Sequence, residues 1–170
     1  MKHRILDYIN EVLINLEINE FSTANIIDIQ NKTFKTNCSG IIKYLLNKCD
    51  RKLASSKAYE IFEELKPIAF STVDSLRPGD IIMWRKNNIP QKGSTGHLAV
   101  FLEEISKDKD SITVKVFDSS KRPHDNDSRS SSGIGIGCMR ILTEEGRATG
   151  FIWSKVEKKT KFTEILFVTP

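Results

Sequence analysis

The chain has 170 residues, of which 39% are hydrophobic and 28% are charged. This balance is typical of a single globular domain that buries a core without disulfides. The 26 basic and 22 acidic residues give a formal charge of only +4, so no strong charge imbalance points to a nucleic-acid partner. No stretch approaches the ~20 apolar residues of a membrane helix, and we expect no membrane span.

The first segment, residues 1–21, has apolar residues at helical spacing with polar residues between them, which predicts an amphipathic helix. A secretory signal would instead be an unbroken apolar segment that ends in small residues. We therefore expect synthesis and residence in the cytoplasm, with export by a dedicated secretion system left open. We treat residues 1–33 as an N-terminal helical extension of one domain, whose catalytic core spans residues 34–170.

After a polar connector, a second helix is predicted to begin at Cys38, with an apolar face that continues to Cys49. A third helix is predicted from about Ser55 to Leu65, because the proline at position 67 restricts the residue before it. Basic residues gather between Lys43 and Lys57. They would suit a nucleic-acid face, but a solvated basic surface explains them better.

The second half of the chain predicts strands. Apolar runs or alternating patterns lie at Ile81–Trp84, His97–Leu102 and Ile112–Val116, and the last two are expected to pair as a hairpin around the charged turn 103–111. Further strands are predicted at 134–142, 150–156 and 163–168, with turn-rich segments at 143–149 and 158–161. Helices followed by strands indicate an α+β fold, with N-terminal helices packed on an antiparallel sheet.

Residues 119–133 are rich in serine and aspartate and contain almost nothing apolar, which predicts a mobile loop. Its place directly after the hairpin is compatible with a lid, and equally with a plain surface excursion. The glycines at 133, 135 and 137 are not set in a βαβ unit. They favour closely packed strand or turn backbone over a phosphate loop.

Cys38 is the candidate nucleophile. A cysteine at the start of a helix gains thiolate character from the helix dipole and the unpaired N–H groups, which also can hold an oxyanion. Ser39 and the glycine after it leave room for a substrate. Cys49 and Cys138 continue apolar patterns and are expected to be core thiols, because three cysteines without a CxxC pair indicate neither a disulfide framework nor a metal site.

The chain has three histidines, and His97 is the best candidate for the base. It begins a strand, whereas His3 lies near the chain end and His124 lies in the polar loop, so neither of these is expected to be held rigidly. A hairpin centred between residues 107 and 108 places His97 opposite Asp118, which would orient the imidazole. A slip of one residue would separate them. The face that carries Asp118 is expected to point toward the helix of Cys38.

Three strings of residues occur in a characteristic order: Thr36–Ile42 around Cys38, then Leu76–Ile82 with Pro-Gly-Asp, then Gly96–Phe101 with Gly-His. This set resembles the NlpC/P60 superfamily. The resemblance implies a papain-like fold and a cysteine peptidase or amidase that uses Cys38, His97 and Asp118. Many relatives cleave amide bonds in cell-wall peptides.

One residue departs from that pattern. The relatives usually have aspartate before the nucleophile, whereas this chain has Asn37, which cannot attract a substrate amine by charge. We expect Asn37, Ser39 and Trp84 to contact substrate, and we expect neither a metal nor another cofactor. The predicted activity is hydrolysis of an amide in a peptide-like substrate through an acyl-enzyme on Cys38.

Two other functions use the same residues. The first is acyl transfer or hydrolysis of a lipid ester, although the lipid-handling relatives usually place histidine before cysteine, the reverse of the order here. The second is a binding module that kept the fold without turnover, against which the intact set Cys38, His97 and Asp118 argues. The sequence does not indicate an oligomeric state.

Overall fold

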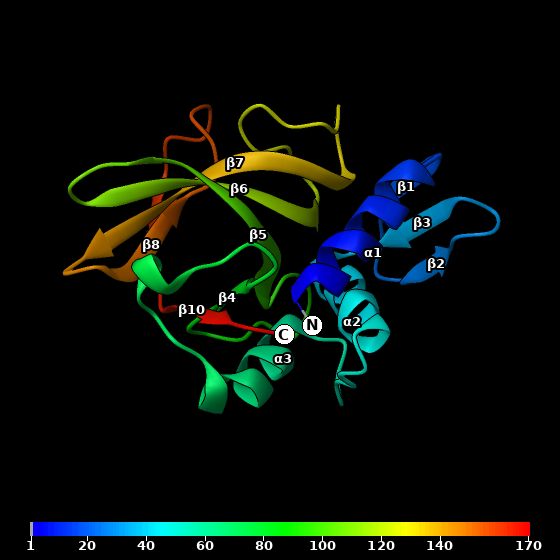
Figure 1. Cartoon of the computed structure of the whole chain (residues 1–170), viewed down its shortest axis with the longest axis horizontal. Coiled ribbons are helices and arrows are strands. Elements are labelled where there is room, and N and C mark those ends of the chain that lie inside the picture. The colour runs from blue at the N-terminus through cyan, green and yellow to red at the C-terminus, as the bar shows by residue number, and fades with distance from the viewer. Residues whose placement is uncertain (1) are drawn as a thin grey trace.

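The structure is a computed structural model that describes residues 2–170, without the side chains of residues 2 and 3. Three helices lie beside a large antiparallel sheet (Figure 1). They are α1 (Lys2–Ile14), α2 (Cys38–Lys48) and α3 (Ala58–Leu65). Two 3-10 turns, η1 (Lys66–Ile68) and η2 (Val73–Ser75), follow α3. The α+β arrangement predicted from the sequence is confirmed.

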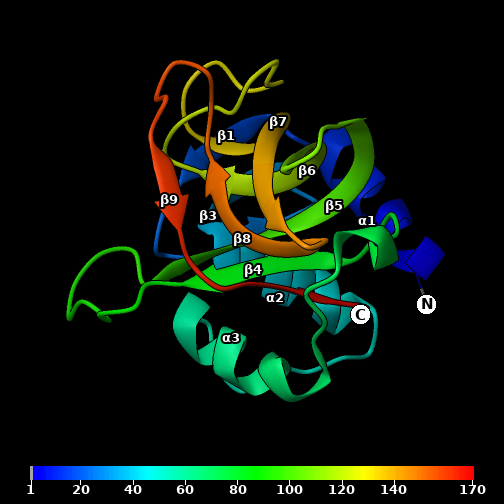
Figure 2. The ribbon, with the colours of Figure 1, turned by 90° about the vertical axis from the view of Figure 1, so that its left-hand side faces the viewer.

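The large sheet has seven strands in the order β10-β4-β5-β6-β7-β8-β9. Its strands are β4 (Ile81–Arg85), β5 (Gly96–Lys107), β6 (Ser111–Ser120), β7 (Gly133–Glu144), β8 (Arg147–Ile152), β9 (Thr160–Phe162) and β10 (Ile165–Val168). The sheet curls strongly, as the view in Figure 2 shows. Residues 70–72 bridge its two sides, because Phe70 pairs with Phe167 of β10 and Thr72 pairs with Arg147 of β8.

The two faces of the sheet bury separate cores. On one face, helix residues such as Ile41 and Leu45 pack against Leu98 and Val100 of β5. On the other face, inside the curl, alternate strand residues pack together, Val114 among them. Because alternate residues of a strand point to opposite faces, Asp118 shares the inner face with Val114. The expectation that this face points toward the helix is therefore wrong.

A small second sheet replaces the expected connector after the first helix. Helix α1 ends at Ile14, and the chain then forms β1 (Ile18–Phe21), β2 (Ile26–Asp28) and β3 (Thr33–Thr36), in the order β1-β3-β2. The polar side chain of Asn19 fixes this sheet to β7, because it exchanges two 2.8 Å hydrogen bonds with the backbone of Ile134. The N-terminal extension is therefore not helical throughout, and its polar residues serve backbone pairing.

Several predicted boundaries differ from the structure. The strands of the hairpin extend to Lys107 and restart at Ser111, so the turn is much shorter than 103–111. Strand β8 ends at Ile152, and β9 occupies part of the expected turn at 158–161. Within residues 2–170, no helix is both long enough and apolar enough to cross a membrane.

Candidate active site

Cys38 is the first residue of α2, where the backbone N–H groups of the first turn point outward. Asn37 is the N-cap, and its Oδ1 accepts a 2.8 Å hydrogen bond from the N–H of Gly40. The N–H groups of Cys38 and Ser39 have no hydrogen-bond partner among residues 2–170. The helix therefore presents free donors beside the sulfur, which is the geometry that holds an oxyanion.

Asn37 and Ser39, both predicted to contact substrate, have side-chain oxygens that are already hydrogen-bonded within the protein. The oxygen of the Asn37 side chain already caps the helix, and the Ser39 hydroxyl is buried 2.6 Å from the carbonyl oxygen of Ser56 and 3.0 Å from Asn37 Oδ1. Both residues line a cavity next to Cys38. The side-chain oxygens of Asn37 and Ser39 thus hold the start of α2 in place through hydrogen bonds.

The segment before Cys38 is locked by close packing. A Cβ atom on Gly40 would lie 2.0 Å from Asn25 Oδ1 and 2.4 Å from Thr36 Oγ1, so only glycine fits there. From the large sheet, Ser119 of β6 donates a 2.7 Å hydrogen bond to the carbonyl oxygen of Thr36. This bond ties the start of α2 to the strand that carries Asp118.

His97 and Asp118 meet inside the curl of the sheet. His97 Nε2 lies 2.7 Å from Asp118 Oδ2, and both side chains are buried. Because Nε2 is engaged by the carboxylate, Nδ1 is the ring nitrogen that remains for Cys38. The third residue of the predicted set is thus brought to His97 by the fold.

The register that suggested this pairing is nevertheless wrong. Val100 pairs with Phe117, so the paired positions sum to 217 near the site and not to the expected 215. The hairpin turns two residues later than expected, and two β-bulges then shift the pairing back along the strands. The net error is even, and an even slip keeps a residue on the same face of the sheet. His97 therefore reaches Asp118 diagonally.

Charges in the site support a proton-transfer role for His97. Burial lowers the pKa of His97, but the charge of Cys38 and hydrogen bonds to Asp118 and Cys38 raise it more, to about 9. Burial likewise raises the pKa of Asp118, yet His124 and His97 hold this pKa well below its ordinary value. Asp118 is therefore ionised at neutral pH, which is the state that stabilises a protonated imidazole.

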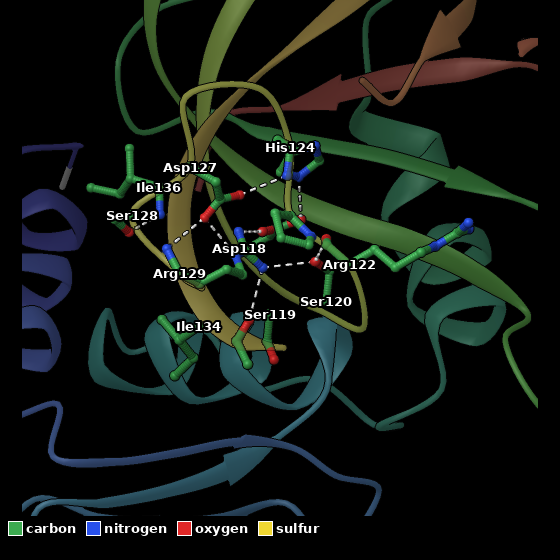
Figure 3. A network of polar contacts seen from close by, with 12 residues as sticks. Asp118, Ser119, Ser120, Arg122, His124, Asp127, Ser128, Arg129, Ile134 and Ile136 are labelled. Carbon is green, nitrogen blue, oxygen red and sulfur yellow. Dashed lines mark hydrogen bonds and ion pairs between the residues drawn. The ribbon is translucent and has the colours of Figure 1, made fainter. Parts of the chain in front are cut away.

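His124 and Arg129 complete the surroundings of Asp118, as Figure 3 shows. His124 Nε2 lies 2.9 Å from Asp118 Oδ2, the atom that also meets His97. On the other side, Arg129 donates from Nη2 to Asp118 Oδ1 and from Nη1 to Ser120 Oγ, the latter over 2.7 Å. The carboxylate is fully buried and is surrounded by donors on both oxygens.

The connection between β6 and β7, residues 121–132, is therefore organised and not the mobile loop that its composition suggested. Arg129 donates from Nε to Asp127 over 2.7 Å, and Asp127 in turn accepts from the backbone N–H of His124. Alternate glycines of β7 make room for this pair: a Cβ on Gly135 would lie 2.5 Å from Arg129 Nε, and one on Gly137 would lie 2.6 Å from Asp127 Oδ2. The expectation of strand backbone at these glycines is confirmed.

Two tryptophans fix the imidazole rings. The ring of His97 lies 5.0 Å from Trp84 and 5.0 Å, edge-on, from Trp153, measured between ring centres. Trp153 also stacks on His124 at 4.0 Å. Trp84, predicted to contact substrate, is 6% exposed and lines the cavity at Cys38. Its main observed contacts are with His97 and Phe151.

Cys38 lies where two cavities meet. One, of about 590 Å³, is lined by His97, Trp84 and Trp153 as well as Cys38. The other, of about 610 Å³, extends past Asn37 toward α3. The thiol thus stands in the middle of a cleft with room on both sides, as a nucleophile that attacks a bond within a longer molecule requires.

The other two cysteines are poorer nucleophiles. Burial raises the pKa of both Cys49 and Cys138, which keeps these thiols protonated at neutral pH. Cys49 belongs to the core between the helices and the sheet. Neither residue lines the cleft at Cys38.

His97, Asp118 and His124 could together offer three ligand atoms to a metal ion, since these atoms lie within 4.8 Å of one another. The surroundings favour the hydrogen-bonded arrangement instead. Arg129 already places a positive charge on the second oxygen of Asp118, and that charge opposes a cation at the first.

The chain was compared with protein families, with curated proteins and with solved structures. No family model matches it, and no curated protein matches it significantly. A solved structure of a lipoprotein-like protein of the NLP/P60 family from Staphylococcus aureus superposes on 81% of the chain, with a TM-score of 0.50 and 15% identity. The chain has the NlpC/P60 fold. It spans 36% of the length of that structure, so the likeness concerns the fold and not the activity.

His124, Asp127 and Arg129 were missed as site residues by sequence reasoning. They lie in a stretch whose composition resembles that of an ordinary surface loop, and the contacts that bury them come from β6 and β7. One signal was available: a histidine and an arginine next to alternating glycines, whose missing side chains leave space for them.

Proposed function

We propose that the protein is a cysteine hydrolase that cleaves an amide bond in a peptide-like substrate through an acyl-enzyme on Cys38. The observation that carries this proposal is the joint placement of Cys38 at a helix N-terminus and of the buried pair His97–Asp118 beside it. A nucleophile, a base and a group that orients the base are the minimal set for acyl transfer.

The reaction follows from the geometry. The thiolate of Cys38 attacks the amide carbon, and the N–H groups of Cys38 and Ser39 hold the oxygen as it becomes negative. Protonated His97 gives its Nδ1 proton to the leaving nitrogen, the C–N bond breaks, and a thioester remains on Cys38. His97 then takes a proton from water as the oxygen of that water attacks the thioester, the C–S bond breaks, and the carboxylic acid leaves, which restores the thiolate of Cys38 and protonated His97.

Asp118 acts through His97. Its hydrogen bond holds Nε2 and leaves Nδ1 facing the thiol, and its charge stabilises the imidazolium. His124 and Arg129 keep Asp118 in place and ionised. They are positioning residues, because neither touches the reacting atoms in this scheme.

The shape of the cleft supports a peptide-like substrate. Space on both sides of Cys38 suits a chain that continues past the scissile bond in two directions. The solved structure with the same fold belongs to a lipoprotein-like member of the NLP/P60 family, which makes cell-wall peptides the first substrates to try. Residence in the cytoplasm stays a prediction.

Trapping of the acyl-enzyme tests the proposal. The protein is mixed with a set of N-acylated peptide amides and bacterial cell-wall peptides, and its intact mass is followed with and without hydroxylamine. We expect an added acyl mass on Cys38 that hydroxylamine releases as the hydroxamate. Cys38→Ala should show no adduct, and Cys49→Ala should behave as the wild type. The same added mass, or none, on both the wild type and Cys38→Ala would contradict the proposal.

A further inference from the structure

Positive charge collects around the cavity that Cys38 shares with His97. Six basic side chains line the cavity that contains Cys38 and His97, against a single acidic one, Glu157. In the chain as a whole the two signs are almost balanced, at 26 to 22. The basic residues at the cavity are Arg85, Lys86, Lys121, Arg122, Lys159 and Lys161.

Two of these charges are already neutralised. Arg122 pairs with Glu157 at 2.7 Å, and Arg85 pairs with Glu63 of α3 at 2.9 Å. Among residues 2–170, the four lysines have no carboxylate partner within ion-pair distance. They are exposed at the rim, and they come from three separate segments of the chain. The cleft therefore carries an unbalanced charge of four lysines.

The second cavity has the same sign. Its charged side chains are Lys57 and again Lys121, and no acidic residue lines it. Lys57 is weakly paired with Glu60 at 3.6 Å. The positive potential thus extends along both sides of the thiol, where a clustered charge attracts anions and raises their local concentration.

The floor of the cavity that Cys38 shares with His97 is aromatic. Phe151 and Trp153 line it, and Lys161 lies over the ring of Phe151 at 5.9 Å. Phe162 at the rim is 75% exposed. Apolar floor and cationic rim together suit a chain that has apolar parts and several separate negative charges.

We propose that the substrate of Cys38 is an acidic peptide, with carboxylate groups on the residues next to the scissile amide. This inference rests on the proposed function, because it concerns the molecule that the same thiol attacks. The carboxylates would lie against Lys86, Lys159 and Lys161 while the backbone passes over Cys38. Because each contact is exposed, the preference is the sum of several weak ion pairs.

The first measurement uses two small reagents that differ in charge. Cys38 is alkylated with iodoacetate and with iodoacetamide, and the ratio of the two rates is divided by the same ratio for N-acetylcysteine. We expect a normalised ratio of about 3 or more in low salt, falling toward 1 in 1 M salt, where the screening length is only about 3 Å. Peptide mapping separates the adduct on Cys38 from adducts on Cys49 and Cys138.

Charge reversal locates the effect. Lys159→Glu with Lys161→Glu should bring the ratio to 1 or below. The matched control, Lys109→Glu with Arg147→Glu, makes the same change of net charge at the far turns of the sheet, which lie at the end opposite Ser120 and Gly133. This control should keep the ratio of the wild type.

The second measurement tests for a peptide. Two peptidyl chloromethyl ketones, one with glutamates and one with glutamines flanking the reactive group, are compared on the same variants. We expect faster inactivation by the glutamate peptide in the wild type and no difference in Lys159→Glu/Lys161→Glu. Equal rates in the wild type would overturn the inference, even if iodoacetate were favoured, because the cleft would then prefer small anions only.

The two measurements distinguish a failure of this inference from a failure of the proposed function. A normalised ratio near 1 with rapid alkylation of Cys38 would overturn the acidic substrate and leave the nucleophile intact. A high ratio with a slow thiol would support the charge of the cleft and contradict the activity. A Cys38 that neither reagent reaches would contradict both.

Discussion

Two segments build the site, and each serves one nitrogen of the His97 ring. Residues 36–40 position the sulfur of the proposed nucleophile by local means: a strand end, an N-cap and a glycine that allows close packing. Residues 121–132 act from a distance by surrounding Asp118 with the buried side chains of His124 and Arg129. In the proposed mechanism, the first segment provides the nucleophile at little cost in stability, whereas the second maintains a buried charge that is expected to matter for both stability and catalysis.

The largest effect is expected from the first segment. Cys38→Ala should lower amide hydrolysis by a factor of about 10³ or more, because the covalent step is lost. Its thermal stability should change little, since the removed sulfur lies at the edge of a cavity. Cys49→Ala is the control: it removes a core sulfur, so it should lower the melting temperature and keep the activity. A loss of activity in Cys49→Ala together with full activity in Cys38→Ala would mean that Cys49, and not Cys38, is the nucleophile.

Asp118→Asn removes the buried charge that the second segment surrounds. It should cost about 3 kcal/mol or more in the free energy of unfolding, because Arg129 and the two histidines lose a buried anion. Activity should fall about 10²- to 10⁴-fold, because the orientation of His97 is lost. Denaturant unfolding and peptide hydrolysis measure the two effects.

Asp80→Asn is the matched control for that variant. Asp80 is also fully buried, and its side chain accepts a 2.8 Å bond from the N–H of Arg77 and a 2.9 Å bond from Thr169. It should lose about 1 to 3 kcal/mol of stability with activity within about twofold of the wild type. An equal loss of activity in both variants would show that Asp118 acts through stability alone.

The pH dependence connects the two segments through His97. With the pKa of His97 raised to about 9, its protonated form persists at neutral pH and is lost as the pH rises through 9, and turnover should decline there. The raised pKa of His97 also stabilises the folded protein. This stabilisation is fully present below pH ~6.5, the pKa of histidine in the unfolded chain, and is lost as the pH rises to about 9. NMR titration of the ring should show a lower pKa in Cys38→Ala, because the charge of Cys38 helps to raise it. An unchanged pKa of His97 in Cys38→Ala would show that the thiol and the imidazole are not electrostatically coupled.

His124→Gln tests the second segment more gently. Glutamine keeps a donor toward Asp118 but removes a charge that lowers the pKa of this carboxyl. The Asp118 contribution to stability and activity is present above its pKa and is lost as the pH falls. The acid limb of the pH–rate profile should therefore move to higher pH, with the loss of activity confined to the acid side and little change at pH 8. Identical pH–rate profiles for His124→Gln and the wild type would show that His124 contributes packing and does not affect the pKa of Asp118.

The smallest effect is expected at Asn37. Aspartate caps a helix as well as asparagine does, so Asn37→Asp should fold normally and bring a carboxylate to the edge of the cavity. It should shift preference toward peptides with a free N-terminal amine by about one power of ten. Matched free-amine and acetylated peptides measure the shift. A wild type that already prefers the free amine equally would place amine recognition elsewhere.

The difference between the segments also explains what the sequence predicted. Cys38, its helix and the strand of His97 follow from patterns within a few residues, and so does the α+β fold. The bulges in β5, the diagonal contact between His97 and Asp118 and the convergence of lysines from three segments depend on pairing between distant parts of the chain. His124 was set aside because polar neighbours normally indicate exposure, whereas here the carboxylate of Asp118 and the carbonyl oxygen of Trp153 engage its buried ring.

The most direct test of the central claim is the rate at which iodoacetamide alkylates Cys38 at pH 7 in the wild type and in His97→Gln. The claim is that Cys38 and His97 form one reactive unit. It predicts that Cys38 reacts at least about tenfold faster than Cys49 and Cys138 in the wild type, and that most of this advantage disappears in His97→Gln. Equal rates of Cys38 in both proteins would contradict the claim.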